Sequence, residues 1–378
     1  MFLWQVSDCN PSRFIRRQDS FRNYGGLIVA TYKDSGVDID AGDRAVELMK
    51  ASVARASRPE VMGGIGGFAG LFDASKLKEM KQPFLATSTD GVGTKTEIAR
   101  QMGIYNTIGE DLVAMVVDDL VVCGAEPLFM TDYIAVGKVI PERIAAIVSG
   151  IAAGCIKAGT ALIGGETAEH PGLLKEDEFD IAGAATGVVD GDLQLGAHRV
   201  KAGDLIIAMP ASGIHANGFS LVRHILATQE LDLTRNYDFS KSLGEVLLTP
   251  TEIYTLDCLA LIKAQGENIR TFSHITGGGL AENTARVIPD GLTAIYDRST
   301  WTLPLEMKFL ADIASVPQAD LERTWNAGIG MSAIVDPAVA DLIVRSLAAR
   351  GMKAWIAGTV EKAAEMGAPR AYLTSQFK

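Results

Sequence analysis

The first half of the chain alternates between segments with helical and with strand-like spacing of apolar residues. From Asp40 to the Arg58-Pro59 pair, apolar residues recur every three or four positions, which predicts a helix with one buried face. Further along, we predict strand 84–89, a helix capped by Thr107 and Glu110 that ends at Gly124, strand 128–136, helix 141–158, strand 161–163 and strand 181–189. This alternation indicates a mixed α/β (α+β) fold.

The same alternation returns after a polar, glycine-containing stretch at 191–203. There we predict strands 205–209, 293–296 and 331–335, with helices starting near Phe219 and Leu280. A chain of 378 residues is long enough for two domains, so we predict an N-terminal domain over 31–195 and a C-terminal domain over 196–378. Residues 1–30 show no apolar period and are expected to be a disordered leader.

Composition excludes several classes of protein. The chain has 35 Lys and Arg against 46 Asp and Glu, which argues against a nucleic-acid groove because phosphate contacts need clustered cations. The most apolar stretch, 144–165, contains Lys157 and many small residues, so we expect a buried helix and strand rather than a membrane span. The N-terminus lacks a secretory pattern and the four cysteines form no CxxC pair, which favours a cytoplasmic protein with reduced thiols.

A glycine-rich loop over 63–70 permits two interpretations. It comes close to a dinucleotide-binding fingerprint, but a helix and the Arg58-Pro59 pair precede it where that motif needs a strand. No P-loop sequence is present either. The loop is therefore either a surface loop or a lid whose backbone amides close over a polyphosphate, and the lid would use Gly64, Gly66 and Gly67.

Three carboxylates are candidates for metal and phosphate chemistry. Asp90 follows a predicted strand, and Asp119 borders the apolar stripe of a predicted helix, where a carboxylate is costly unless it is paired. Oxygen ligands of this kind suit Mg²⁺ with a bound polyphosphate. Glu166, after strand 161–163, is expected to complete an acidic cluster at the strand ends. For each, the alternative is an ion pair or a solvated side chain.

Two lysines and two glycine-flanked loops complete the candidate site. Lys50 and Lys95 are candidates for contacts with phosphates, although Lys50 alone is typical of a solvated helix lysine. A loop with His215 and Asn217 suits hydrogen bonding to a polar ligand. The segment Thr276-Gly277-Gly278 leads into a helix and is a candidate anion site, the alternative being an ordinary glycine turn. The absence of a GxSxG motif argues against a serine hydrolase.

Seven segments together resemble one enzyme family. In chain order they are Tyr32-Lys-Asp-Ser-Gly-Val-Asp-Ile-Asp-Ala-Gly42, Arg58-Pro-Glu-Val-Met-Gly-Gly64, Thr89-Asp-Gly-Val-Gly-Thr-Lys95, Asp119-x4-Gly-Ala-Glu-Pro127, Gly164-Gly-Glu-Thr-Ala-Glu169, His215-Ala-Asn-Gly218 and His274-Ile-Thr-Gly-Gly-Gly279. They resemble the phosphoribosylformylglycinamidine cyclo-ligases, or aminoimidazole ribonucleotide synthetases, over roughly residues 32–332.

The resemblance implies an ATP- and Mg²⁺-dependent ring closure in purine biosynthesis. It implies a homodimer whose N-terminal domains form a shared β-barrel, and an α/β sandwich as the C-terminal domain. It also implies that ATP and Mg²⁺ lie near Asp90 and Asp119 and that Lys50 lies at the ATP site. We assign Asp90, Asp119 and Glu166 to positioning of the metal and phosphates. His215 and Asn217 are expected to hold the ribotide or orient the reacting amide, and His215 is the candidate for proton transfer. No nucleic acid or membrane partner is implied.

The sequence departs from the family at two informative positions. Asp118 stands where Asn is expected, so the charge near the metal could differ. Ala327 stands where Cys is common, so no thiol can be essential there. Two other functions remain open at this stage: another ATP-dependent phosphoryl-transfer enzyme of the same superfamily, or a nucleotide-binding protein without catalysis.

Overall fold

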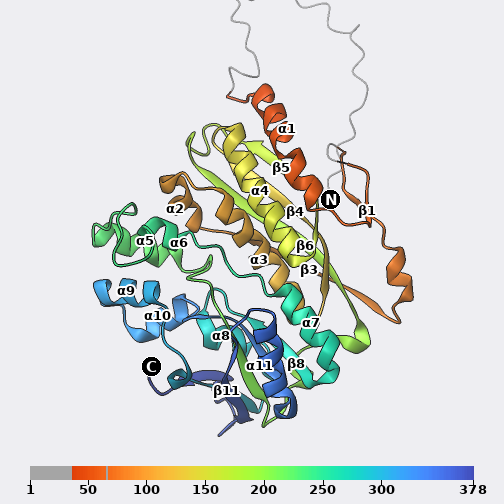
Figure 1. Cartoon of the computed structure of the whole chain (residues 1–378), viewed down its shortest axis with the longest axis vertical. Helices are drawn as coiled ribbons and strands as arrows, with labels where there is room; N and C mark the ends of the chain where they lie inside the picture. Colours follow the sequence, from red (N-terminus) through yellow and green to blue (C-terminus); the bar gives the residue numbers. More distant parts are fainter. Residues whose placement is uncertain (1–35, 65–66) are drawn as a thin grey trace, which may run out of the picture.

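The computed structural model describes residues 36–64 and 67–378, which form two α/β domains, each built on its own sheet (Figure 1). The expected leader over 1–30 and Gly66 of the glycine loop lie outside the described residues. Within the described part, no helix combines the length and the apolar character needed to cross a membrane.

The N-terminal sheet has the strand order β3-β6-β4-β5, and only the β4–β5 pair is parallel. Its strands are β3 (Pro83–Gly91), β4 (Glu126–Val136), β5 (Ala161–Glu169) and β6 (Phe179–Asp190). The helices of this domain are α1 (Ile39–Arg55), α2 (Lys95–Met102), α3 (Asn106–Val122) and α4 (Pro141–Ala158). Helices α3 and α4 cover one face of the sheet, and α1 packs against α4. A short hairpin, β1 (Val61–Met62) with β2 (Leu71–Phe72), carries the glycine loop.

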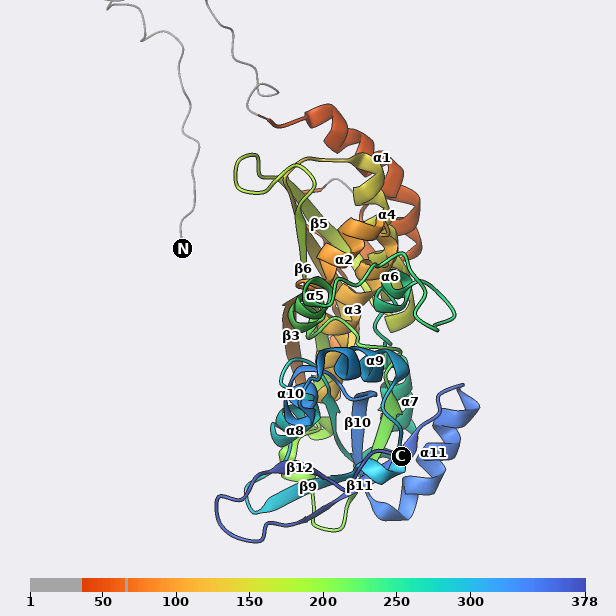
Figure 2. The ribbon, with the colours of Figure 1, turned by 90° about the vertical axis from the view of Figure 1, so that its left-hand side faces the viewer.

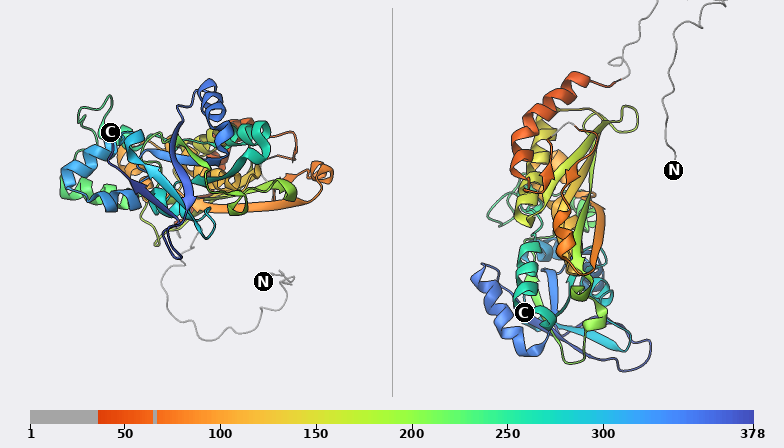
Figure 3. Two further views of the ribbon diagram at one scale, coloured as in Figure 1. Left: turned by 90° about the horizontal axis from the view of Figure 1, so that it is seen from below. Right: turned by 90° about the vertical axis from the view of Figure 1, so that its right-hand side faces the viewer.

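The other face of this sheet is left without a covering helix by the described residues, as Figure 2 and the right-hand view of Figure 3 show. Side chains alternate between the two faces of a strand, so exposure identifies the residues on the open face. Leu85, Thr87, Thr131, Tyr133 and Glu166 are all exposed there. We call this side of the sheet, on which these residues are exposed, the open face.

The C-terminal sheet has six strands in the order β12-β9-β11-β7-β10-β8, antiparallel except for β12 with β9. Its strands are β7 (Leu205–Pro210), β8 (Ile269–His274), β9 (Leu292–Asp297), β10 (Ile329–Val335), β11 (Trp355–Lys362) and β12 (Ala371–Thr374). Helices α7 (Thr255–Gln265) and α11 (Ala340–Ala349) pack on one face and α8 (Gly279–Ala285) on the other. This architecture agrees with the α/β expectation.

A single apolar core joins the two domains. Four helices that follow the first strand of the second sheet bury their apolar sides in the core of the N-terminal domain: α5 (Phe219–Thr228), α6 (Leu243–Leu247), α9 (Leu305–Ala314) and α10 (Gln318–Thr324). In Figure 1, α5 and α6 lie beside α2. The domains are therefore held by shared hydrophobic burial as well as by polar contacts.

Two local predictions need correction. The Thr107–Glu110 capping box is wrong, because Tyr105 is the N-cap, no side chain caps the helix, and the Thr107 hydroxyl is buried without a partner. Strand β5 continues through the Gly164-Gly165-Glu166 segment to Glu169, where the sequence suggested a strand end. Pairing with β4 extends the strand, and single-segment patterns do not reveal such pairing.

Candidate active site

A pocket of about 340 Å³ lies where the two domains meet. Its walls come from β3, the last turn of α3, the end of β8, Thr276 before α8, and the last turn of α8 with the residues after it. The polar side chains that line it include Asp119, His274, Thr276, Asn283 and Arg286. Residues from both halves of the sequence therefore meet at one polar pocket.

Asp119 and His274 form a hydrogen-bonded pair in this pocket. The Nδ1 atom of His274 lies 2.8 Å from Oδ1 of Asp119. Burial alone would lower the pKa of His274, but the bond to Asp119 and the charges of Asp118, Asp119 and Asp90 together raise it above its ordinary value. Burial and the nearby Asp119 also raise the pKa of Asp90, which indicates that the two candidate metal ligands are electrostatically coupled.

The acidic residues that are fully buried are not the ones singled out from the sequence. The Asp119 side chain is 48% exposed, so the expected desolvation cost does not apply to it. Asp111 and Asp118 are fully buried, and Asp111 is paired with Lys95 and bonded to Thr251. Asp118 accepts hydrogen bonds from the Tyr254 amide and the Thr255 hydroxyl at the start of α7. The idea that buried acids here require a metal ion is therefore wrong, and the Asp118 carboxylate bonds to the C-terminal domain.

Replacing Asp118 with Asn should stabilise the protein above pH 6. Burial raises the pKa of Asp118 from its ordinary value of 3.8 to about 6, so the folded state binds the proton more tightly than the unfolded chain does. This group's contribution therefore falls as pH rises from about 4 to 6 and stays low above that range. An amide keeps an acceptor for Thr255 without the charge. We expect a gain of about 1–3 kcal/mol at pH 8 and almost none near pH 4.

Urea denaturation of the Asp118→Asn variant across this pH range measures the effect. Asp192→Asn, at an exposed position, is the matched control and should change little at either pH. A less stable Asp118→Asn variant at pH 8 would mean that the hydrogen bonds to the ionised carboxylate outweigh its desolvation.

The glycine loop before α8 is held from inside by Asn283, a residue that the sequence analysis did not identify. Its side-chain amide donates to the carbonyl oxygens of Thr276, Gly277 and Gly279 at 3.2, 3.2 and 2.8 Å. A buried amide whose two N–H groups are shared among three carbonyls orders the loop before any ligand binds.

His215 and Asn217 lie next to this loop. A Cβ on Gly277 would be 3.5 Å from Oδ1 of Asn217, so the two C-terminal loops are neighbours. The amide of Ser212 donates to Nε2 of His215 at 3.2 Å, which places the proton of the neutral imidazole on Nδ1. Burial lowers the pKa of His215 well below its usual value, and His274 and Lys95 add to this effect. His215 is thus neutral, and its buried Nδ1 has no hydrogen-bond partner among the described residues, which does not favour the predicted proton-transfer role.

Glu166 is not brought to the acidic pair within one chain. It pairs with Tyr133 in the sheet and is exposed on the open face, whereas Asp90 lies on the helix-covered side. Strands β5 and β3 are also opposite edges of the sheet, roughly 14 Å apart. The expected cluster of Asp90, Asp119 and Glu166 is therefore wrong for a single chain.

Two further ATP-binding candidates, Lys50 and the glycine loop, lie on the β5 side as well. Lys50 is exposed on α1 and pairs with Glu47. Gly64 and Gly67 are exposed in the β1–β2 hairpin, whose base at Gly70 packs on Ile163 of β5. The single chain thus separates Lys50 and this loop from Asp90 and Asp119.

The chemistry of Asp90 and Asp119 suits Mg²⁺ bound together with a polyphosphate. Mg²⁺ in such sites commonly takes one or two carboxylates and completes its shell with phosphate oxygens and water. Asp119 has one oxygen on His274 and a side chain open to the pocket. The described residues contain no cluster of three or more potential ligands, so a nucleotide would have to supply the remaining oxygens.

Two family models match the chain, and together they cover most of it. The model described as "AIR synthase related protein, N-terminal domain" matches residues 73–189, and the corresponding C-terminal domain model matches residues 201–368. The chain belongs to the AIR synthase related family.

Relatives in this family are similar over almost their whole length. The phosphoribosylformylglycinamidine cyclo-ligase of Desulfitobacterium hafniense is 49% identical over 336 residues, which are 89% of this chain and 98% of the relative. The cyclo-ligases of Lachnospira eligens and Geobacillus kaustophilus are each 48% identical and cover 87% and 88% of this chain, with 97% and 96% of their own lengths matched.

Solved structures with the same fold share little sequence with this AIR synthase related chain. A thiamine-monophosphate kinase from Stenotrophomonas maltophilia matches with a TM-score of 0.62 and 17% identity, covering 89% of this chain and 97% of that one. The hydrogenase maturation protein HypE in complex with ATP also matches with a TM-score of 0.62 and 17% identity, covering 90% and 92%. At this identity the likeness establishes the fold alone.

Proposed function

We propose that the protein closes the imidazole ring of 5-aminoimidazole ribonucleotide, starting from formylglycinamidine ribonucleotide and ATP. The observation that supports this most strongly is the 48–49% identity to cyclo-ligases over 96–98% of their lengths. The pocket at the domain junction agrees with it, because it combines the Asp119 carboxylate with Thr276 of an ordered glycine loop. A cytoplasmic location is part of the same proposal, in keeping with the free thiols of Cys123, Cys155 and Cys258.

In the proposed reaction, phosphorylation turns the formyl oxygen of the substrate from a poor leaving group into a good one. The γ-phosphoryl group of ATP transfers to the formyl oxygen, and ADP leaves. The substrate's own amine then attacks the activated carbon, the C–O bond breaks, and inorganic phosphate departs with that oxygen. This chemistry depends on positioning and on neutralising phosphate charge, so it needs no protein nucleophile. Ala327 at the position where a thiol was expected fits that requirement.

In this proposal Asp90 and Asp119 hold Mg²⁺, which would neutralise the charge on the phosphates of bound ATP. His274 keeps the Asp119 carboxylate in a fixed direction through its hydrogen bond. Thr276, Gly277 and Gly278, ordered by Asn283, offer backbone groups to the ribotide. His215 and Asn217 lie beside them and would orient the reacting amide.

We also propose that two copies of the chain assemble through the open face into the expected β-barrel. A sheet face with Leu85, Tyr133 and several threonines exposed is a surface on which another sheet can pack. Dimerisation would also place Glu166 in an interface and offer a way to bring Lys50 and the β1–β2 loop of one copy towards Asp90 and Asp119 of the other. This accounts for the separation of these residues within a single chain.

The decisive assay measures ADP and phosphate release with formylglycinamidine ribonucleotide, together with formation of the aminoimidazole product. The analogue that lacks the formyl group is the matched control and should give no ADP above background, because it offers no oxygen to phosphorylate. Thiamine monophosphate should also give none. Equal ADP release with the unformylated analogue, or phosphorylation of thiamine monophosphate, would overturn the proposal in favour of another phosphoryl-transfer activity.

A further inference from the structure

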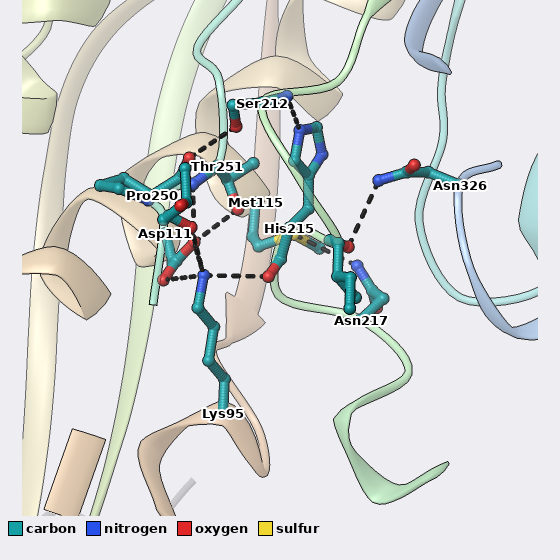
Figure 4. A network of polar contacts seen from close by, with 11 residues as sticks. Lys95, Asp111, Met115, Ser212, His215, Asn217, Pro250, Thr251 and Asn326 are labelled. Carbon is teal, nitrogen blue, oxygen red and sulfur yellow. Dashed lines mark hydrogen bonds and ion pairs between the residues drawn. The ribbon is translucent and has the colours of Figure 1, made fainter. Parts of the chain in front are cut away.

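Lys95 is a fully buried cation that connects three separate segments of the chain (Figure 4). It begins α2 in the N-terminal domain. Its Nζ atom lies 2.9 Å from Oδ1 of Asp111, 3.0 Å from the carbonyl oxygen of His215 and 2.8 Å from that of Thr249. The ammonium also lies 5.4 Å from the ring centre of Phe219.

These contacts use the whole hydrogen-bonding capacity of the side chain. A lysine ammonium has three N–H donors, and each has an acceptor within 3.0 Å. No donor is left for a phosphate oxygen, and no part of the side chain is exposed. Burial lowers the pKa of Lys95 and raises the pKa of Asp111, while each group's charge opposes the shift in the other. The geometry therefore does not favour the predicted contact between Lys95 and ATP.

Asp111 extends the same network to the segment that contains Thr251. It accepts from both the amide and the hydroxyl of Thr251, at 2.8 Å from the amide nitrogen and 2.5 Å from the hydroxyl oxygen. The neighbouring Ser212 hydroxyl donates to the carbonyl of Pro250 at 2.6 Å. The turn that carries His215 is thus tied to segment 249–251 through Lys95 and through Ser212 (Figure 4).

This turn has a conformation that requires external support. His215 has φ +69°, in the left-handed region that residues other than glycine seldom adopt. Its ring fits closely, because a Cβ at Gly330 would overlap both the ring and the Tyr254 hydroxyl. Asn326 further holds the turn by donating to the carbonyl of Gly213 at 2.9 Å. If the His215 carbonyl lost its hydrogen bond from Lys95, the turn would shift. The imidazole would then leave the orientation that its bond from Ser212 fixes.

We propose that Lys95 and Asp111 are positioning residues that fix the His215–Asn217 turn in the orientation needed for ring closure, without contacting ATP. This inference rests on the proposed function for the identity of the substrate. It gives a function to the buried charge pair, which joins α2 and α3 to the His215–Asn217 turn of the other domain.

The test compares Lys95→Met with the double variant Lys95→Met/Asp111→Asn. The double variant removes both charges, so no unpaired charge remains buried, and the oxygen of the introduced side-chain amide can still accept from Thr251. The exposed pair Lys81–Asp192, 3.1 Å apart, provides the matched control Lys81→Met/Asp192→Asn. For each protein, one measures the dissociation constant of a non-hydrolysable ATP analogue, kcat and KM for ring closure, and the melting temperature.

We expect the double variant to fold and to bind the ATP analogue within about twofold of the wild type, while its kcat falls by about 10- to 100-fold because the turn is misplaced. The control pair should leave all four quantities unchanged. A tenfold or greater loss of nucleotide affinity would show direct phosphate contact and overturn the proposal. Wild-type kcat in the double variant would also overturn it, since the pair would then serve folding alone.

A second measurement does not depend on turnover. In protein labelled with ¹⁵N-histidine, the wild-type His215 should show a protonated Nδ1 and an unprotonated Nε2, as its bond from Ser212 requires. The double variant should lose this single tautomer, and an unchanged spectrum would contradict the proposal. If the wild type itself fails to close the ring, the proposed function is refuted, while this spectrum still decides whether Lys95 positions His215.

Discussion

Replacing Asp119 with Asn should lower the turnover of ring closure by about a hundred- to a thousandfold while leaving the fold intact. Asn has nearly the same size and keeps an oxygen that can accept from His274, so the hydrogen bond of 2.8 Å has a substitute. The lost quantity is the negative charge that would hold Mg²⁺ next to Asp90. Because Asp119 is half exposed, its replacement disturbs no packed core.

Steady-state ADP release at saturating Mg²⁺, with circular dichroism as the folding check, measures this effect. Asp312→Asn is the control, because that side chain is exposed and lies outside the segments that line the pocket. Normal turnover of Asp119→Asn at saturating Mg²⁺ would exclude Asp119 as a metal ligand.

Replacing Thr131 with Arg should convert the proposed dimer into monomers and abolish most of the activity. Thr131 lies on an inner strand of the sheet, on the open face, between Ala184 of β6 and Gly164 of β5. A guanidinium introduced there would have to be buried without a partner if two sheets packed together, which is strongly unfavourable. In the monomer the same side chain stays in water, so the fold should persist.

Light scattering during size-exclusion chromatography gives the mass of both proteins. The exposed Gln229→Arg substitution, after α5, adds the same charge away from the open face and should leave the mass unchanged. A wild type that is monomeric at assay concentrations, or a Thr131→Arg variant that keeps the dimer mass, would show that the open face is not the interface.

Periodicity and turn residues predicted much of the fold because those signals are local. Helix α4 begins at Pro141 and ends at Ala158, as its apolar pattern and the proline at its first position indicate. Strand β4 ends at Val136 as predicted, although it starts two residues earlier, at Glu126. The alternation of strands and helices in both halves likewise predicted the α/β class.

The candidate site was harder to predict because burial and pairing depend on distant residues. Asp111 was not among the candidates from the sequence, yet it is completely buried and bonded to Lys95 and Thr251. Asp119 looked costly on an apolar helix, yet it faces the pocket and His274. The local sequence around either acid does not show which side of α3 the other domain covers. The same limit applies to Asn283, whose three carbonyl partners are created by the loop's own conformation.

The burial of Asp111 and Asp118 has a consequence for dividing the protein into parts. Both carboxylates are enclosed by segment 249–255, which comes from beyond the first sheet. An isolated first half would present these acids and Lys95 to water and would also expose the apolar surfaces that α5, α6 and α9 cover. Each fragment should therefore fold less stably than the whole chain. A chimera built from halves of two relatives should fold only when helix α3 and segment 249–255 come from the same relative.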